Sequence, residues 1–551
     1  MGFATIGLPG LPIPGLYAKV NLLSYFPTGE PLTACKADIT MHASVRNSLL
    51  ILSFAAISVF YYFLTWSSEL PILGGDHPVY LLMADHLSFF PGLKLEVTSV
   101  AMRYTAFPPL YPLLLGMFGG TSAHVGVAHA ITTTFMLAAV VTYFSWLRCE
   151  TRSTLEAFIL SLIFTFLSTT LLQSLGILSE NLYLLLTLLA IWLLNKPEIN
   201  LPRLYAIATV IGLAAITRTI GVTLIMAFAV YLFIHKKDQR IKLILVSTVP
   251  IVSWNILRWF LDYKGGYLWL VVDIAKRGPL AVLLSKQISI ESHALWVGWI
   301  TSLNHLPTMM TLIAGSALGA ICLAGSIRRA YLKQLDGIYV LFYFSLLLLW
   351  PFSLEAKRFL YVIMPMLLFH GLEFSDYLFQ RFSLRKILVH AYLLMIALVA
   401  FPATGLIFNR MALAAHDENK MYANSYDWYS DADLDTARKK IRSHLQLVRS
   451  WKKVSKIVPE NECVYHVDAP SLMLYADRRS YSPPIAFTKD QFLKMANYCR
   501  YFYLGSYTRI PYRRLFYPRE YVVGAGKIVF VDRMDDAEDA PILGMLVEMP
   551  P

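Results

Sequence analysis

The sequence predicts a polytopic α-helical membrane protein with a small mixed α/β domain at its C-terminal end. Of its 551 residues, 56% are hydrophobic and 15% are charged, whereas soluble domains are nearer a quarter charged. Long apolar runs recur through residues 45–409, and residues 410–551 alternate short strand-like and helix-like segments instead. The net charge of +12 does not indicate nucleic acid as a partner, because many basic residues lie in short loops where they report topology.

Residues 1–44 are predicted to form a disordered N-terminal tail. They contain Gly, Pro and Leu without a helical period, and no basic segment precedes an apolar core as in a signal peptide. Met41 directly precedes HASVRNSLLILSF and looks like a natural N-terminus.

Eleven membrane helices are expected between residues 45 and 409. Several of the apolar runs are shorter than the roughly 20 residues that a bilayer core needs, so tilted or broken spans are expected. The runs lie near 45–66, 123–147, 155–173, 178–195, 203–217, 220–234, 241–260, 307–326, 336–351, 359–377 and 386–408.

Basic residues predict the orientation of these helices. Lys and Arg cluster in alternate short loops, near residues 148–152, 196–203, 236–242, 328–333 and 381–386, whereas the opposite short loops hold only Arg218, Lys357 and Arg358. The positive-inside rule then places the N-terminus in the cytoplasm. The long loops 67–122 and 261–306 and the C-terminal domain would lie outside, at what we expect to be a bacterial inner or plasma membrane.

The second long loop is rich in aromatic and basic residues, which favours either an anionic lipid headgroup site or a plain aromatic belt. These residues are Tyr263, Lys264, Tyr267, Trp269, Lys276, Arg277, Lys286, Trp296 and Trp299.

The C-terminal domain is predicted to contain strands at 463–468, 500–507 and 527–533, with short helices at 471–476 and 489–498. It has no Gly-rich phosphate loop and no His/Cys cluster, so a cap or an acceptor-binding module is expected. Cys463 and Cys499 either pair, if this domain is extracytoplasmic, or are two unrelated buried side chains.

Four charged residues are expected to converge at the outer face. Asp76 follows the first span, Glu180 begins the fourth, Arg218 follows the fifth and Arg358 begins the tenth. Ionisable groups at membrane depth are costly unless they are paired, hydrated or used. The structural alternatives are a solvated loop acid, a helix cap, a snorkelling arginine and an interfacial anchor, respectively.

Together these groups suit transfer of a group from a phosphate-bearing lipid to an acceptor. Arginines bind phosphate through bidentate forks. One carboxylate can act as general base, and a second can orient the acceptor or help to hold a divalent cation.

Five motifs come in the order and spacing of the GT-C membrane glycosyltransferases. Asp76 with Tyr80 and LLMADHL is followed by PPLYPLLLG (108–116), SENLYLLLTLLAIWLL (179–194), TRTIG (217–221) and RFLYVIMP (358–365). The chain most resembles the branch of dolichyl-phosphate-mannose–protein mannosyltransferases and the aminoarabinose transferase of lipid A.

This resemblance implies an inverting transfer of a sugar from a polyprenyl-phosphate or dolichyl-phosphate donor to a lipid, glycan or protein acceptor. Asp76 would be the catalytic base and Glu180 the second acid, while Arg218 and Arg358 would bind the donor phosphate. Tyr80, His77 and Arg103 are further candidates for substrate contact. Many relatives carry Asp-Glu where this chain has Asp76-His77, so metal dependence is left open and no cofactor is assigned.

Two alternatives remain from the sequence. A transporter or flippase of a lipid-linked glycan should place polar residues near the bilayer midplane, often with repeated halves, and here the polar residues gather at one face without an internal repeat. A catalytically inactive relative that serves as a binding subunit is the other.

Overall fold

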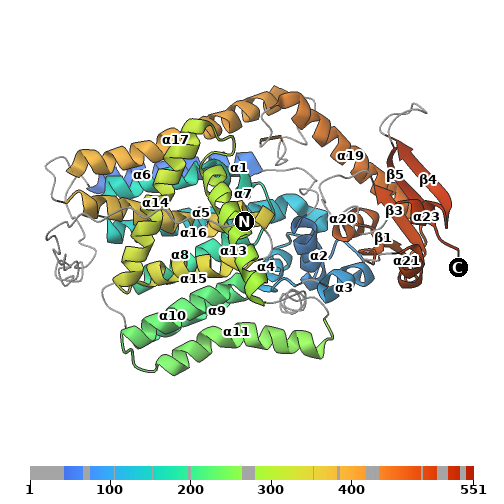
Figure 1. Cartoon of the computed structure of the whole chain (residues 1–551), viewed down its shortest axis with the longest axis horizontal. Coiled ribbons are helices and arrows are strands. Elements are labelled where there is room, and N and C mark those ends of the chain that lie inside the picture. The colour runs from blue at the N-terminus through green and yellow to red at the C-terminus, as the bar shows by residue number, and fades with distance from the viewer. Residues whose placement is uncertain are drawn as a thin grey trace, which may run out of the picture.

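The computed structural model places most of the chain in helices, with one β-sheet near the C-terminus (Figure 1). It describes residues 43–65, 75–104, 106–151, 153–195, 200–263, 280–350, 353–380, 385–416, 428–429, 433–484, 488–505, 519–533 and 542–550. Apart from residues 43 and 44, which open the first helix, the expected N-terminal tail lies outside these ranges.

The apolar runs of the sequence form the helices of the bundle. These are α1 (Ala43–Thr65), α5 (Val125–Glu150), α6 (Thr154–Thr165), α7 (Ser168–Ser174), α8 (Glu180–Leu194), α9 (Leu201–Ala215), η3 (Thr219–Gly221), α10 (Val222–Ile234), α11 (Arg240–Phe260), α14 (Met309–Tyr331), α15 (Leu335–Leu348), η4 (Ser353–Glu355), α16 (Ala356–Leu378) and α17 (Arg385–His416). Figure 1 shows that the axes of α8, α9, α10, α11 and α16 are roughly aligned.

By length and composition, the described residues include six helices able to cross a membrane, or seven if the bent pair α6 and α7 counts as one span. Four shorter apolar helices accompany them, at Glu180–Leu194, Leu201–Ala215, Thr219–Ile234 and Leu335–Leu348. The chain is therefore a polytopic helical membrane protein. Ten of the eleven expected runs each coincide with one of these helices, and the run at 155–173 divides into α6 and α7. Crossing by all eleven stays a prediction.

The two long loops are not simple loops. The first folds into α2 (His77–Leu87), α3 (Leu95–Tyr104), α4 (Leu110–Met117) and η2 (Ser122–His124), and the second contains the 24-residue helix α13 (Leu280–Leu303). Polar residues such as Gln287, Glu291 and His293 interrupt the apolar character of α13, which hides it from a search for apolar runs.

Two tryptophans of α13 pack onto α14. The indole N–H of Trp296 donates to Ser316 Oγ (3.0 Å), and that of Trp299 donates to the carbonyl of Gly315 (2.7 Å). Both indole groups thus have hydrogen-bond partners within the protein. Most of the other aromatic and basic residues of this loop, Lys264 to Arg277, lie outside the described residues.

A buried charged cluster joins α5, α14, α15 and α16. Arg329 pairs with Asp336 (2.6 Å), Glu373 (2.6 Å) and Glu150 (3.4 Å), and Asp336 also contacts His370 Nε2 (2.8 Å). Glu373 lies 15 residues after Arg358 along α16, or roughly 22 Å at helical rise. The structure therefore has a charged cluster well away from Arg358, near the basic loops at residues 148–152 and 328–333.

The C-terminal part contains a five-stranded mixed sheet in the order β2-β1-β3-β5-β4 (Figure 1). The strands are β1 (Cys463–Tyr465), β2 (Arg479–Tyr481), β3 (Tyr501–Gly505), β4 (Lys527–Arg533) and β5 (Ile542–Glu548), with helices α19 (Leu434–Ile457), α20 (Ala469–Ala476), α21 (Lys489–Met495) and α23 (Arg519–Val523). β1 pairs in parallel with β2 and β3, and β5 pairs antiparallel with β3 and β4.

The predicted strands at 463–468, 500–507 and 527–533 correspond to β1, β3 and β4, and both predicted short helices are present. Sequence analysis missed β2, β5, α19 and α23. One face of α19 carries Leu447, Trp451 and Val454, whose helical spacing lets them pack with the sheet. The expected boundary at 409/410 falls within α17, which runs on to His416.

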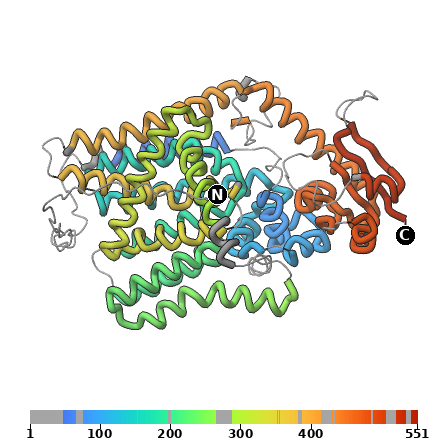
Figure 2. The backbone as a smooth tube through the Cα atoms, in the orientation of Figure 1, coloured from blue at the N-terminus to red at the C-terminus, as the bar shows by residue number. Residues whose placement is uncertain are grey.

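Helix α20 joins the C-terminal part to α2 and α3. Met473 of α20 packs with Leu82 of α2 and with Val97 and Val100 of α3. The backbone tube in Figure 2 shows this C-terminal part beside α2 and α3, at one end of the bundle. The meeting of these two parts forms one side of the site described below.

Cys463 at the start of β1 is joined to Cys499 just before β3 by a disulfide. Of the two interpretations that the sequence left open, the structure has the paired one. Disulfides persist mainly in oxidising compartments.

We expect the isolated full chain, denatured without reductant, to incorporate two fewer thiol labels than after reduction, as counted by intact mass. In Cys463→Ser, the released Cys499 should add one label without reductant. Equal label counts before and after reduction of the unmodified chain would contradict the pairing.

Candidate functional site

The turn before α2 sets the position of Asp76. Gly75 has a φ of +66°, a left-handed conformation that glycine adopts without a Cβ penalty. Asp76 is the N-cap residue of α2 and Pro78 lies in the first turn, where its missing N–H costs nothing. The Asp76 side chain makes no capping hydrogen bond, so its carboxylate is available for other contacts.

Glu180 lies at the start of α8 and its side chain is fully buried. Its Oε1 pairs with Arg218 Nη1 (2.6 Å) and with Arg358 Nε. Arg218 also donates to Ser179 Oγ (3.1 Å) and lies over the ring of Phe359. A buried carboxylate requires such pairing, because its desolvation is otherwise prohibitive.

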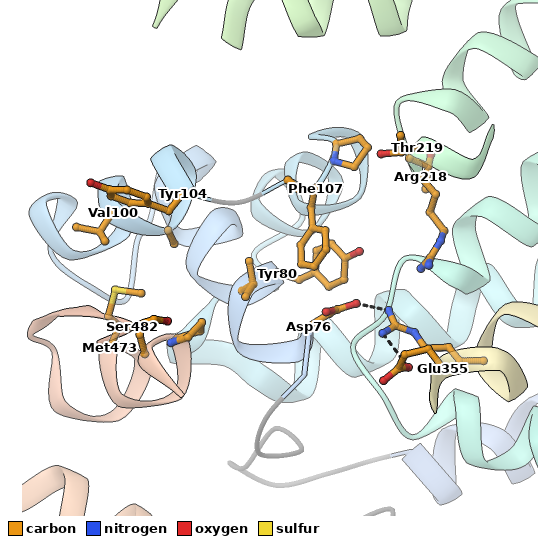
Figure 3. A pocket seen from close by; sticks show the side chains of 18 of the residues that line it. Asp76, Tyr80, Val100, Tyr104, Phe107, Arg218, Thr219, Glu355, Met473 and Ser482 are labelled. Carbon is orange, nitrogen blue, oxygen red and sulfur yellow. Dashed lines mark ion pairs between the residues drawn. The ribbon is translucent and has the colours of Figure 1, made fainter. Parts of the chain in front are cut away.

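Arg358, in the first turn of α16, links three carboxylates. Besides Glu180, it contacts Asp76 Oδ2 through Nη2 (2.5 Å) and Glu355 Oε2 through Nη1 (3.7 Å). The dashed lines in Figure 3 mark the ion pairs with Asp76 and Glu355. The structure thus joins the four charged residues that the sequence expected to converge, from α8, α16, the start of α2 and the turn after α9.

These ion-paired residues lie at one end of a cavity of about 680 Å³ between the helix bundle and the C-terminal part. One end is lined by Asp76, Arg218, Glu355 and Arg358, among others. The other end is uncharged and lined by residues of α3 and the C-terminal part, including Val100, Tyr104, Met473, Tyr481 and Ser482. Figure 3 shows Arg218 and Tyr104 on opposite sides, with Tyr80 and Phe107 between them.

Tyr80 forms part of the wall of this cavity. Its hydroxyl shares a hydrogen bond with Ser179 Oγ (2.7 Å), and its ring stacks on Phe107 with centroids 5.1 Å apart. Since Ser179 also accepts from Arg218, Tyr80 connects α2 to the ion-paired group.

His77 and Arg103, expected as further substrate contacts, are not among the residues that line the cavity. His77 is buried, and its Nδ1 accepts a hydrogen bond from the backbone N–H of Ile177 (3.1 Å). Burial, with the positive charge of Arg358, lowers the pKa of His77 to about 3, so its ring is neutral. A Cβ at Gly176 would lie 2.6 Å from His77 Cε1; this close approach requires glycine. Arg103 is exposed on α3.

Sequence analysis missed Glu355, a half-exposed carboxylate at the charged end. Burial raises its pKa, against the opposing effect of Arg358. Its position three residues before Arg358 could have drawn attention to it, since such neighbours share a helix face. The tyrosines of the uncharged end gave no such signal, because their approach depends on how α3 meets the sheet.

The charged end does not fit a divalent cation. The described residues contain no group of three or more His, Cys, Asp or Glu side chains that could hold a metal ion. A hard cation needs several oxygen ligands, whereas one guanidinium already contacts Asp76, Glu180 and Glu355.

No protein family model and no curated protein matches this chain. Among solved structures, it is similar to ArnT from Cupriavidus metallidurans bound to undecaprenyl phosphate, with a TM-score of 0.49 and 11% identity over 90% of this chain and 97% of that chain. It is also similar to the Archaeoglobus fulgidus oligosaccharyltransferase tethered with an acceptor peptide, with a TM-score of 0.46 and 12% identity over 82% and 69% of the two chains.

A structure of the Archaeoglobus fulgidus oligosaccharyltransferase AglB with an inhibitory peptide and a dolichol-phosphate gives a TM-score of 0.45 and 14% identity, over 85% of this chain and 70% of that chain. These neighbours belong to the GT-C superfamily, which the sequence motifs resemble. At such identities, the roles of individual residues rest on the contacts within this chain.

Glu180→Gln should destabilise the fold, because it leaves Arg218 and Arg358 without their shared buried partner. Breaking a buried ion pair costs roughly 3–5 kcal/mol, so the melting temperature of the purified full chain should fall clearly. Glu355→Gln, which removes a half-exposed carboxylate, is the control and should cost less than about 1 kcal/mol. Equal melting temperatures for Glu180→Gln and the unmodified chain would contradict the structural role of Glu180.

Proposed function

We propose that this protein transfers a sugar from a polyprenyl-phosphate donor to an acceptor at the outer face of the membrane. The observation that carries the proposal is the convergence of Asp76, Glu180, Arg218 and Arg358 at one end of a cavity between the helix bundle and the C-terminal part. The sequence resemblance to GT-C glycosyltransferases points to the same reaction class.

The donor phosphate would bind between Arg218 and Arg358. Both guanidinium groups line the cavity, and their planar forks match the oxygen spacing of a phosphate. Glu180 is bound to both, so it would hold the two forks in position before the donor arrives. Such preorganised cations stabilise the negative charge that develops on a leaving phosphate.

Asp76 would act as the general base. Its carboxylate borders the cavity and pairs with Arg358 through Oδ2. An acceptor hydroxyl or amine would attack the anomeric carbon and form the new glycosidic bond while the bond from that carbon to the phosphate oxygen breaks. The acceptor proton would pass to Asp76, the bonding electrons would leave with the polyprenyl phosphate, and the anomeric configuration would invert.

Two independent features support the proposed sidedness of the site. The basic loops gather away from Asp76, which favours an outer location for the cavity. The disulfide between Cys463 and Cys499 suits an oxidising compartment for the C-terminal part. Both support a membrane protein with a cytoplasmic N-terminus and an external C-terminal domain.

Catalysis explains the arrangement better than transport of a lipid-linked glycan. A transporter is expected to bind its cargo near the bilayer midplane, between repeated halves. Here the charged end lies where α8 and α16 begin, and residues of the C-terminal part line the other end of the cavity.

Asp76→Asn should lower sugar transfer by about 10²- to 10⁴-fold without loss of folded protein, because an amide cannot accept the proton. The measurement is mass spectrometry of membrane glycolipids and glycoproteins from cells that carry each variant in place of the unmodified gene. Glu96→Gln, an exposed acid on the nearby α3, is the matched control and should leave transfer unchanged.

Glu355→Gln completes this comparison, since Glu355 is the other acid that lines the charged end. We expect a smaller loss than for Asp76→Asn. Full transfer by Asp76→Asn, with loss in Glu355→Gln, would move the role of base to Glu355.

Arg218→Lys should weaken binding of undecaprenyl phosphate to the purified full chain about tenfold, which corresponds to about 1.4 kcal/mol. Lysine keeps the charge that pairs with Glu180 but lacks the bidentate fork. Arg148→Lys, at an exposed position near the end of α5, is the control. Unchanged affinity in Arg218→Lys would remove this arginine from the phosphate site.

A further inference from the structure

A second, smaller cavity of about 230 Å³ adjoins the uncharged end of the main one. It is lined by Tyr104, Tyr465, Tyr481, Ser482, Pro484, Met495 and Tyr498, and it shares Tyr104, Tyr481 and Ser482 with the main cavity. We call it the tyrosine groove. It extends the main cavity over the C-terminal part, on the side away from Arg218.

Three rings of the tyrosine groove form a continuous series. Tyr481 meets Tyr104 edge to face at 5.7 Å and Tyr498 edge to face at 5.0 Å. Tyr104 and Tyr498 nevertheless remain 48% and 64% exposed. Large aromatic side chains that stay exposed together beside a cavity are typical of a binding surface.

The sheet places two of these tyrosines side by side. Tyr465 ends β1 and Tyr481 ends β2, and the two residues are register partners in this parallel pair. The carboxyl ends of neighbouring parallel strands are where open α/β sheets commonly bind ligands. The groove therefore occupies a place in the fold that favours binding.

The lining selects the chemistry of the ligand. None of the described residues that line the groove is Lys, Arg, Asp or Glu, so a phosphate or another anion would lack the charged donors that it needs. The negative faces of the rings attract the weakly positive C–H groups of a sugar ring. Tyrosine and serine hydroxyls can both donate to and accept from sugar hydroxyls.

We propose that the tyrosine groove is the acceptor subsite and that it binds a neutral sugar ring of a glycan acceptor. This inference rests on the proposed function: the donor phosphate occupies the charged end, and the acceptor enters from the uncharged end and presents a hydroxyl group to Asp76. The acceptor would then be a carbohydrate, either free or part of a glycolipid or glycoprotein.

The test uses the purified full chain in phospholipid nanodiscs and saturation-transfer NMR with three neutral disaccharides: cellobiose, maltose and lactose. We expect saturation transfer to the ring protons of at least one of them. Tyr104→Ala and Tyr498→Ala should each weaken this binding about fivefold, while Tyr498→Phe keeps most of it because the ring remains. Tyr331→Ala, an exposed tyrosine of α14 that lines neither cavity, should have no effect.

Two results would overturn the assignment to carbohydrate. The first is the absence of saturation transfer to all three disaccharides, or saturation transfer that both alanine variants leave unchanged. The second is binding of the uncharged peptide N-acetyl-Ala-Ser-Ala-amide instead, lost in the same variants, which would make the groove a polypeptide site.

Binding of undecaprenyl phosphate, measured on the same preparations, separates this inference from the proposed function. Tyr498→Ala, at a residue that does not line the main cavity, should leave that binding unchanged. If the unmodified chain fails to bind undecaprenyl phosphate, the proposed donor is wrong, whatever the disaccharides show.

Discussion

The site depends on the burial of one carboxylate. Glu180 has no exposed side-chain surface, and two arginines from separate parts of the chain contact the same oxygen. A lone carboxylate could not be buried there, and neither arginine could stay close to the other without it. Because Arg358 also contacts Asp76 and Glu355, this pairing fixes the start of α2 and the start of α16 relative to α8.

The same pairing explains how a cavity with two unlike ends can exist. Glu180 pairs with both arginines on the bundle side of the cavity. The opposite wall therefore needs no acidic residue to hold them in place, and its lining is uncharged. That wall comes from α3 and the C-terminal part, which are joined by packing of Met473 and by the ion pair of Lys94 with Glu460 (2.5 Å). In the reaction that we propose, the donor phosphate and the acceptor would therefore approach Asp76 from different sides.

Much of the membrane region could be predicted from the sequence. Each apolar run is helical in the structure. A bilayer requires apolar segments that satisfy their own backbone hydrogen bonds, and this requirement does not depend on which segments lie beside them. Asp76, Glu180, Arg218 and Arg358 could also be found, since an ionisable group beside an apolar run is costly enough to stand out. Helix α13 was missed because its polar residues interrupt the apolar run.

The sequence by itself determined the membrane class, the helices formed by the apolar runs and the importance of Asp76, Glu180, Arg218 and Arg358. Local composition marks the apolar runs, and the cost of a charge beside them marks these four residues. Only the tertiary structure decided which charges pair, that Glu355 joins them and that His77 faces Ile177. It also decided that Tyr104 meets Tyr481, 377 positions later in the chain. Such contacts depend on how distant segments pack, and no local pattern encodes that packing.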